Sequence, residues 1–335
     1  MLTNIQALRA VAALVVVLSH LLVTARSYGQ PVSLALPDGW GDFGVDVFFV
    51  ISGFVMVYTQ DRRRRTAGEF LRNRLWRIVP IYWLLTGAMI ALLMLAPGAF
   101  RDETRSAELI VSSLLFVSTL VADRMAVLYV GWSLEYEMLF YGLFALGLLF
   151  RRERDAFLFP VVALVVLVGL GWSRPLALEF VFGMGIARLH RAGMLPLGLP
   201  LAALGAGLLA ATLVWRPDAD RLLTWGVPAA LLVHGALTMR QTASRILVYL
   251  GDASYSIYLL QVFTLPAFYK FSTRHADGLP YDLLGVLALG WTVAAACLFY
   301  QYVERPLLAL GRKKPGRSRA DGADALNPTA VRNPD

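Results

Sequence analysis

The chain has 335 residues, of which 58% are hydrophobic and only 16% are charged, and its mean hydropathy is +0.61. Soluble domains carry roughly 25% charged residues, so this composition excludes an ordinary soluble enzyme and indicates a membrane protein. The formal net charge of +8 at pH 7 does not indicate nucleic-acid binding, because the basic residues cluster in short stretches between long apolar segments.

Cysteine and histidine usage excludes two further classes of site. Cys297 is the only cysteine, so no intrachain disulfide is possible. The four histidines have no metal-ligand spacing. We therefore predict no metal centre and no permanently bound cofactor.

Apolar stretches of the length needed to cross about 30 Å of hydrocarbon recur along the whole chain. The long stretches cover residues 6–25, 43–59, 78–96, 132–150, 156–172, 196–215, 222–239, 246–268 and 281–303. Two shorter stretches cover residues 109–122 and 176–189.

The distribution of arginine decides which of these stretches cross. If the N-terminus is cytoplasmic, the arginine-rich loop 62–77 is cytoplasmic too, as the positive-inside rule requires. Treating 109–122 as non-spanning returns the arginines of 151–154 to the cytoplasm, and counting 176–189 as a span keeps the later basic segments there. We predict an all-α, polytopic transmembrane helical bundle of about ten spans with both termini cytoplasmic.

The end of the chain differs in composition from the rest. Residues 311–335 are rich in Lys, Arg, Gly, Pro and Asp and lack apolar periodicity. We therefore expect one transmembrane domain over residues 1–310, followed by a disordered basic cytoplasmic tail.

Arg9 and His20 are ionisable residues inside the first predicted span. Such residues are costly in lipid and usually functional. Eleven helical residues turn through about three turns, so the two side chains share one helix face about 16 Å apart.

His20, Asp46 and Glu137 come from three different spans and are predicted at similar depth, in the outer half of the membrane. A lone histidine on an apolar face is more often a hydrogen-bonded core residue than a catalytic one. A histidine with carboxylates at the same depth instead offers a base and a group that fixes its tautomer. Both interpretations of His20 stay open at this stage.

Arg72, Arg74 and Arg77 directly precede the third span. Ordinary positive-inside anchoring explains them as well as a functional role does. Because the planar guanidinium group suits phosphates, they are also candidates to bind a phosphorylated cytosolic donor.

Six motifs in this order resemble the acyltransferase 3 family, particularly its bacterial members that O-acylate exopolysaccharides. Any one of the motifs is weak, but together they extend over residues 4–308. They are LRAVA at 8–12 with His20, GVDVFFVISGF at 44–54, FLRNRLWRIVPIYW at 70–83, WSL at 132–134 with Glu137, SYSIYL at 254–259 and VERP at 303–306. One departure is Gln261, which stands where the family often has a histidine.

The resemblance implies transfer of an acyl group, expected to be acetyl, from cytosolic acyl-CoA to a saccharide hydroxyl across the bacterial inner membrane. His20 is expected to act as general base or transient acyl carrier, oriented by Asp46 or Glu137. The implied donor-side residues are Arg9, Arg72, Arg74 and Arg77, and the acceptor-side residues are Trp132 and Tyr141.

Two other classes of protein compete with this hypothesis. Buried His, Asp and Glu also build proton relays, so a transporter or flippase of a lipid-linked sugar is the main alternative. A scaffold or sensor is a third class, but it leaves the intramembrane charges without a purpose. Release of free CoA on addition of acceptor separates an enzyme from a transporter.

Overall fold

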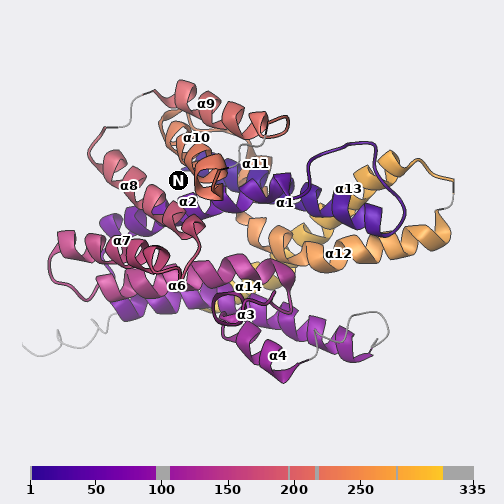
Figure 1. Cartoon of the computed structure of the whole chain (residues 1–335), viewed down its shortest axis with the longest axis horizontal. Coiled ribbons are helices and arrows are strands. Elements are labelled where there is room, and N and C mark those ends of the chain that lie inside the picture. Colours follow the sequence, from indigo (N-terminus) through magenta and orange to yellow (C-terminus); the bar gives the residue numbers. More distant parts are fainter. Residues whose placement is uncertain (1, 96–105, 195–196, 216–218, 277, 312–335) are drawn as a thin grey trace, which may run out of the picture.

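The computed structural model describes residues 2–95, 106–194, 197–215, 219–276 and 278–311. All regular structure in this part of the chain is helical, and Figure 1 shows the helices packed as one bundle. The first half contains α1 (Thr3–Ser27), η1 (Trp40–Asp42), α2 (Phe43–Arg62), α3 (Ala67–Leu95), α4 (Ala107–Leu114), α5 (Ser118–Ala122), η4 (Tyr129–Gly131), α6 (Trp132–Gly147) and α7 (Glu153–Gly169). The second half contains η5 (Pro175–Leu178), α8 (Glu179–Arg191), α9 (Gly198–Ala211), η6 (Leu222–Gly226), α10 (Val227–Thr238), α11 (Arg245–Asp252), α12 (Ser254–His275), α13 (Tyr281–Phe299), η7 (Tyr300–Glu304) and α14 (Arg305–Leu310).

Four of the described helical segments are long and apolar enough to cross a membrane. A fifth is possible if the pair α11 and α12, bent by 66°, counts as one span. The four are Thr3–Ser27, Trp40–Arg62, Ala67–Leu95 and Tyr281–Leu310. The chain is thus a membrane protein with several apolar helices.

The remaining predicted spans also form helices, but these are short. The helices α6 to α9 have 13 to 17 residues, and η6 with α10 covers Leu222–Thr238. At 1.5 Å per residue such helices are shorter than the roughly 30 Å of the hydrocarbon core. Every predicted span therefore coincides with a helix, while the number of full crossings stays a prediction.

Residues 109–122 form two separate short helices, α4 and α5. Phe116 lies between them with φ of 59°, a left-handed conformation that interrupts the helix. The eight residues of α4 extend for only about 12 Å. Neither helix is long enough to cross the bilayer.

The helix α2 is the centre of the bundle. The apolar window of its segment is 78% buried inside the protein, whereas that of Tyr281–Leu310 is 28% buried. Close contact with α8 depends on two glycines: a Cβ atom on Gly53 would lie 2.0 Å from the Phe180 carbonyl oxygen, and one on Gly183 would lie 2.0 Å from that of Val50. Small residues of this kind let membrane helices approach backbone to backbone.

The helix α3 begins earlier than its apolar stretch. Thr66 and Glu69 form a capping box, in which the Glu69 amide donates to the Thr66 hydroxyl and the Thr66 amide donates to the Glu69 carboxylate, each over 3.2 Å. As a result Arg72, Arg74 and Arg77 lie on a helix, where the sequence predicted a loop.

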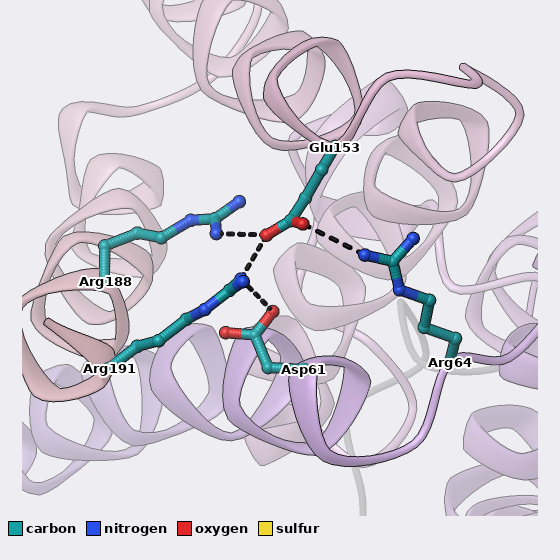
Figure 2. Close-up of polar contacts among 5 residues, drawn as sticks. All are labelled: Asp61, Arg64, Glu153, Arg188 and Arg191. Carbon is teal, nitrogen blue, oxygen red and sulfur yellow. Dashed lines mark hydrogen bonds and ion pairs between the residues drawn. The ribbon is translucent and has the colours of Figure 1, made fainter.

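Ion pairs connect α2, α7 and α8 at one end of the bundle, as Figure 2 shows. Glu153 accepts from Arg188 over 2.7 Å, from Arg64 over 3.0 Å and from Arg191, which also contacts Asp61 over 3.2 Å. These residues belong to three segments that the positive-inside rule had placed on one side of the membrane. The connection from α6 to α7 lies at the left-hand end of Figure 1, and α12 and α13 extend to the right-hand end.

Candidate active site

A cavity of about 360 Å³ lies between α1, α2, α3, α6 and α12. Its walls include five side chains predicted from the sequence to belong to the site. These are Arg9, Arg74, Arg77, Glu137 and Tyr141. Residues from the first and fourth predicted spans and from the segment just before the third therefore line one chamber, and three of its wall residues are arginines.

Helix geometry decides which arginines reach this cavity. Arg74 and Arg77 are three residues apart on α3 and so lie on one face of that helix. Arg72 is two residues from Arg74, which places it about 200° around the axis, and it is exposed outside the cavity wall. Of the three arginines proposed from the sequence to bind a donor, the structure therefore brings Arg74 and Arg77 to the cavity and leaves Arg72 outside it.

The arginines of the cavity keep hydrogen-bonding capacity for a ligand. Arg9 donates to the Ser254 hydroxyl over 3.0 Å and to the Gln6 amide oxygen over 3.2 Å. The guanidinium carbon of Arg74 lies 5.8 Å from the centre of the Phe70 ring. Its Nε is buried and has no hydrogen-bond partner in the described part of the chain. A buried N–H without an acceptor is costly, so this cavity suits an anionic ligand.

Glu137 is held by two hydroxyl groups inside the cavity. Ser52 donates to its carboxylate over 3.0 Å, and Tyr141 donates to the same oxygen. Ser52 thus serves as a donor to the carboxylate, and within the part of the chain that the structure describes no histidine is hydrogen-bonded to it, as the base of a serine nucleophile would be.

His20 lies on α1 outside the cavity wall and contacts Gln261 of α12. The His20 Nδ1 and Gln261 Oε1 atoms are 3.1 Å apart, and the Tyr129 ring meets the imidazole edge-on at 5.2 Å between centroids. The Gln261 amide nitrogen donates to the Tyr258 carbonyl oxygen over 2.9 Å, which fixes the direction of the amide group. Its oxygen therefore faces Nδ1, so Nδ1 carries the proton and Nε2 is left with the lone pair.

Tyr258 connects the histidine to the cavity. Its side chain lines the cavity wall, its hydroxyl donates to the Val130 carbonyl oxygen over 2.8 Å, and its own carbonyl oxygen holds Gln261. One turn of α12 thus separates the cavity wall from the group that orients His20.

Asp46 faces away from the cavity and forms a separate cluster. It accepts two hydrogen bonds from Arg221, over 3.0 Å from Nε and 2.7 Å from Nη2. The Arg221 guanidinium lies 5.5 Å from the Trp132 ring centre and 4.9 Å from that of Trp225. Trp132 therefore belongs to the Asp46 cluster through Arg221, whereas Tyr141 is hydrogen-bonded to Glu137. The two residues predicted to lie together on the acceptor side are thus in different clusters.

The expected contact of the His20 ring with a carboxylate is not made among the described residues. His20 pairs with Gln261, Asp46 with Arg221, and Glu137 with Ser52 and Tyr141. An amide oxygen takes the orienting position that the sequence assigned to Asp46 or Glu137. The depth argument was too weak because three residues at one depth can face different neighbours.

Two charged residues of this region were missed from the sequence. Glu179 is fully buried near Arg221, and neither of its oxygens has a hydrogen-bond partner in the described part of the chain. A signal existed, since Glu179 is an ionisable residue within the predicted span 176–189. For Arg221, at the start of a span, sequence gives no partner, because its contact with Asp46 joins residues 175 positions apart.

These features define a membrane protein whose helices line a cationic cavity, with an oriented histidine farther along one of the same helices. The profile of the acyltransferase 3 family, described as an acyltransferase domain, matches residues 2–301. The chain therefore belongs to the acyltransferase 3 family and is a membrane acyltransferase by descent.

Two curated proteins are similar to it along most of their length. The exopolysaccharide production protein ExoZ of Rhizobium meliloti (strain 1021) is 38% identical over 295 residues, which cover 82% of this chain and 92% of the relative. The acyltransferase MdmB of Streptomyces mycarofaciens is 27% identical over an alignment of 390 residues, gaps included. That alignment covers 99% of this chain and 98% of the relative. No solved structure matches the chain.

Proposed function

We propose that this protein transfers an acyl group, expected to be acetyl, from cytosolic acyl-CoA to a hydroxyl of an extracytoplasmic or lipid-linked saccharide. One observation carries the proposal: Arg9, Arg74 and Arg77 line one cavity, and the helix that supplies Arg9 also supplies the oriented His20. The name of the relative ExoZ, which refers to exopolysaccharide production, supports a saccharide acceptor.

The donor is proposed to enter from the cytoplasmic side. Its phosphates bind the cavity arginines, and its pantetheine arm runs along α1 from Arg9 toward His20. The two residues lie about 16 Å apart along the helix axis, a distance comparable with the length of that arm.

His20 then removes a proton through Nε2, the nitrogen that Gln261 leaves unprotonated. In direct transfer, the saccharide hydroxyl loses this proton and attacks the thioester carbonyl, and the C–S bond breaks to release CoA thiolate. The thiolate takes up the proton from the imidazolium. In the alternative route His20 itself carries the acyl group between donor and acceptor.

The proposal places the protein in the bacterial inner membrane, with about ten spans and both termini cytoplasmic. Acyl-CoA is a substrate in this scheme, and no permanently bound cofactor takes part.

Purified protein in liposomes tests the proposal by the release of free CoA from acetyl-CoA with and without acceptor. We expect His20→Ala to lower acceptor-dependent release by at least about 100-fold, because general-base catalysis contributes that much. The folded state of the variant is checked by its thermal unfolding midpoint. Activity near that of the wild type would contradict the role of His20, and saccharide movement without CoA release would identify a transporter.

A further inference from the structure

A second cavity, of about 180 Å³, lies at the end of the bundle where the ion pairs of Figure 2 connect α2, α7 and α8. The helices α2 and α6 line both cavities, and the second cavity lies farther along them than the first. Met56 of α2 and Tyr141 of α6 line the first cavity, and Val57 and Phe144 line the second. In the proposed topology this end faces the cytoplasm.

Four arginines line the second cavity, but the carboxylates nearby neutralise only some of them. The four are Arg64, Arg65, Arg151 and Arg188. The Glu153 carboxylate already forms ion pairs with Arg64, Arg188 and Arg191. Within the described ranges, Arg65 and Arg151 have no side-chain hydrogen bond and no ion pair, so the hollow keeps an excess of positive charge.

Neighbouring groups hold the Arg65 backbone and the Arg188 guanidinium at this cavity. The Gln60 side chain donates to the Arg65 carbonyl oxygen over 2.8 Å and accepts from the Arg65 amide over 3.3 Å, which fixes the backbone of that residue. The Arg188 guanidinium lies 4.6 Å from the centre of the Phe157 ring. An anion that binds here therefore meets one guanidinium group already in place, that of Arg188, and the guanidinium groups of Arg65 and Arg151 are left to pair with it.

The other side of the cavity is apolar and continues onto the surface. Phe144, Leu148 and Phe150 line it, and Phe150 is 47% exposed. Leu149 beside it is 68% exposed and Leu146 is 49% exposed. An anionic head could thus bind the arginines while attached chains lie on exposed aliphatic and aromatic surface.

We propose that this second cavity binds the phosphate ester of an anionic phospholipid headgroup. Arginine forms short, charge-assisted hydrogen bonds with phosphate oxygens. Basic hollows between helix ends on the cytoplasmic side of a membrane are suited to such headgroups. The site is distinct from the acyl-transfer cavity, and its ligand is held whether or not the proposed reaction occurs.

Arg65 and Arg151 offer an internally controlled test, because each has a neighbouring arginine that does not line the cavity. The test variant is R65Q/R151Q and the control is R63Q/R152Q, which removes the same charge from exposed positions. A short-chain fluorescent phosphatidylglycerol is titrated into the purified full-length protein in non-ionic detergent. Phosphatidylcholine of the same chain length serves as the neutral reference.

We expect R65Q/R151Q to weaken phosphatidylglycerol binding by about tenfold or more, and the control by less than about twofold. R65K/R151K, which keeps both charges, should retain part of the affinity and shows whether loss of binding reflects loss of folding. Equal effects in the two glutamine variants, or none in either, would overturn the proposal. Displacement of the lipid by adenosine 3′,5′-bisphosphate more readily than by unlabelled phosphatidylglycerol would assign the cavity to a soluble phosphate ester and overturn the lipid assignment.

Discussion

Gln261 determines how the His20 ring is held, because its amide is itself fixed by the Tyr258 carbonyl oxygen. We expect Gln261→Leu to lower kcat about 10- to 100-fold, since the imidazole loses the acceptor that sets its tautomer. The KM for acetyl-CoA should change little. Steady-state kinetics of CoA release measure both constants.

Gln261→Glu is the matched control for this prediction. It keeps an acceptor oxygen at the same distance along the side chain but loses the N–H that donates to the Tyr258 carbonyl oxygen, so it should retain more activity than Gln261→Leu without reaching that of the wild type. A purely structural role would be indicated if the leucine and glutamate variants lost activity equally and unfolded at equally lowered temperatures.

The arginines of α3 allow a second prediction, because neighbouring residues differ in whether they reach the cavity. Arg74→Gln and Arg77→Gln should each raise the KM for acetyl-CoA about tenfold, the effect of losing one charge-assisted hydrogen bond. Arg72→Gln and Arg63→Gln, both at exposed positions, should change it less than about twofold. Equal effects at all four positions would favour general membrane anchoring.

For single residues of the candidate site, the sequence indicates which side chains are candidates better than it indicates which side chains they contact. The spacing of Arg9 and His20 needs only the geometry of one helix, and both residues lie on α1. The partner of Asp46 depends on which helix packs against α2, and no local pattern contains that information. The exclusion of Arg72 from the cavity was within reach, because 200° of rotation from Arg74 follows once the helix is known to begin before residue 72.

Among the elements, α2, α7 and α8 depend on Glu153 for their connection at one end of the bundle. Hydrogen bonds from Arg188 and then Arg191 lower the pKa of Glu153 from its ordinary 4.5 to about 2. A lowered folded-state pKa means that the ionised group stabilises the fold above pH 4.5, and that this stabilisation is lost as the pH falls toward 2.

We therefore expect Glu153→Gln to lower the thermal unfolding midpoint by roughly 1–3 °C at pH 7, as exposed ion pairs contribute about 1 kcal/mol or less. The difference from the wild type should persist down to about pH 5 and shrink at lower pH. Differential scanning fluorimetry in detergent across pH 3–7 measures it. Asp155→Asn, in the same first turn of α7, is the control, and a difference that grows on acidification would contradict this account.

Helix positions were predicted more successfully than helix lengths. The apolar stretches located a helix at each predicted span, but a capping box moved the start of α3 to Ala67. The predicted span 246–268 divides into α11 and α12, which meet at 66°. Such breaks depend on local geometry and on packing against neighbouring helices, which hydropathy does not record.

For the whole molecule, the proposed topology can be tested with the single cysteine. Cys297→Ala provides a background in which new cysteines are introduced at the exposed residues Ala35, Arg124 and Arg152. A membrane-impermeant maleimide applied to intact spheroplasts should label the first two sites and not the third. Labelling at residue 152 from outside would show that residues 109–122 cross the membrane and would exclude the ten-span arrangement.

The bundle as a whole combines four long apolar helical segments of the described chain, one of which contains the central helix α2, with a set of shorter helices. The helices from α6 to α10 each have at most 17 residues, and α6 and α8 pack against the central helix α2. The distribution of basic residues is enough to predict which loops share one side of the membrane, because the positive-inside rule concerns loops. It could not indicate how far each helix reaches, since that depends on the protein packed around it.

Arg9 and His20 lie on one continuous helix, so the number of residues between them is constrained as well as their identity. One residue inserted between them would turn His20 by about 100° around the axis, away from Gln261, although no side chain is lost. Seven inserted residues would nearly restore its direction but move it about 10 Å farther along the helix. A segment that tolerates exchange of one aliphatic residue for another should therefore tolerate neither insertion nor deletion.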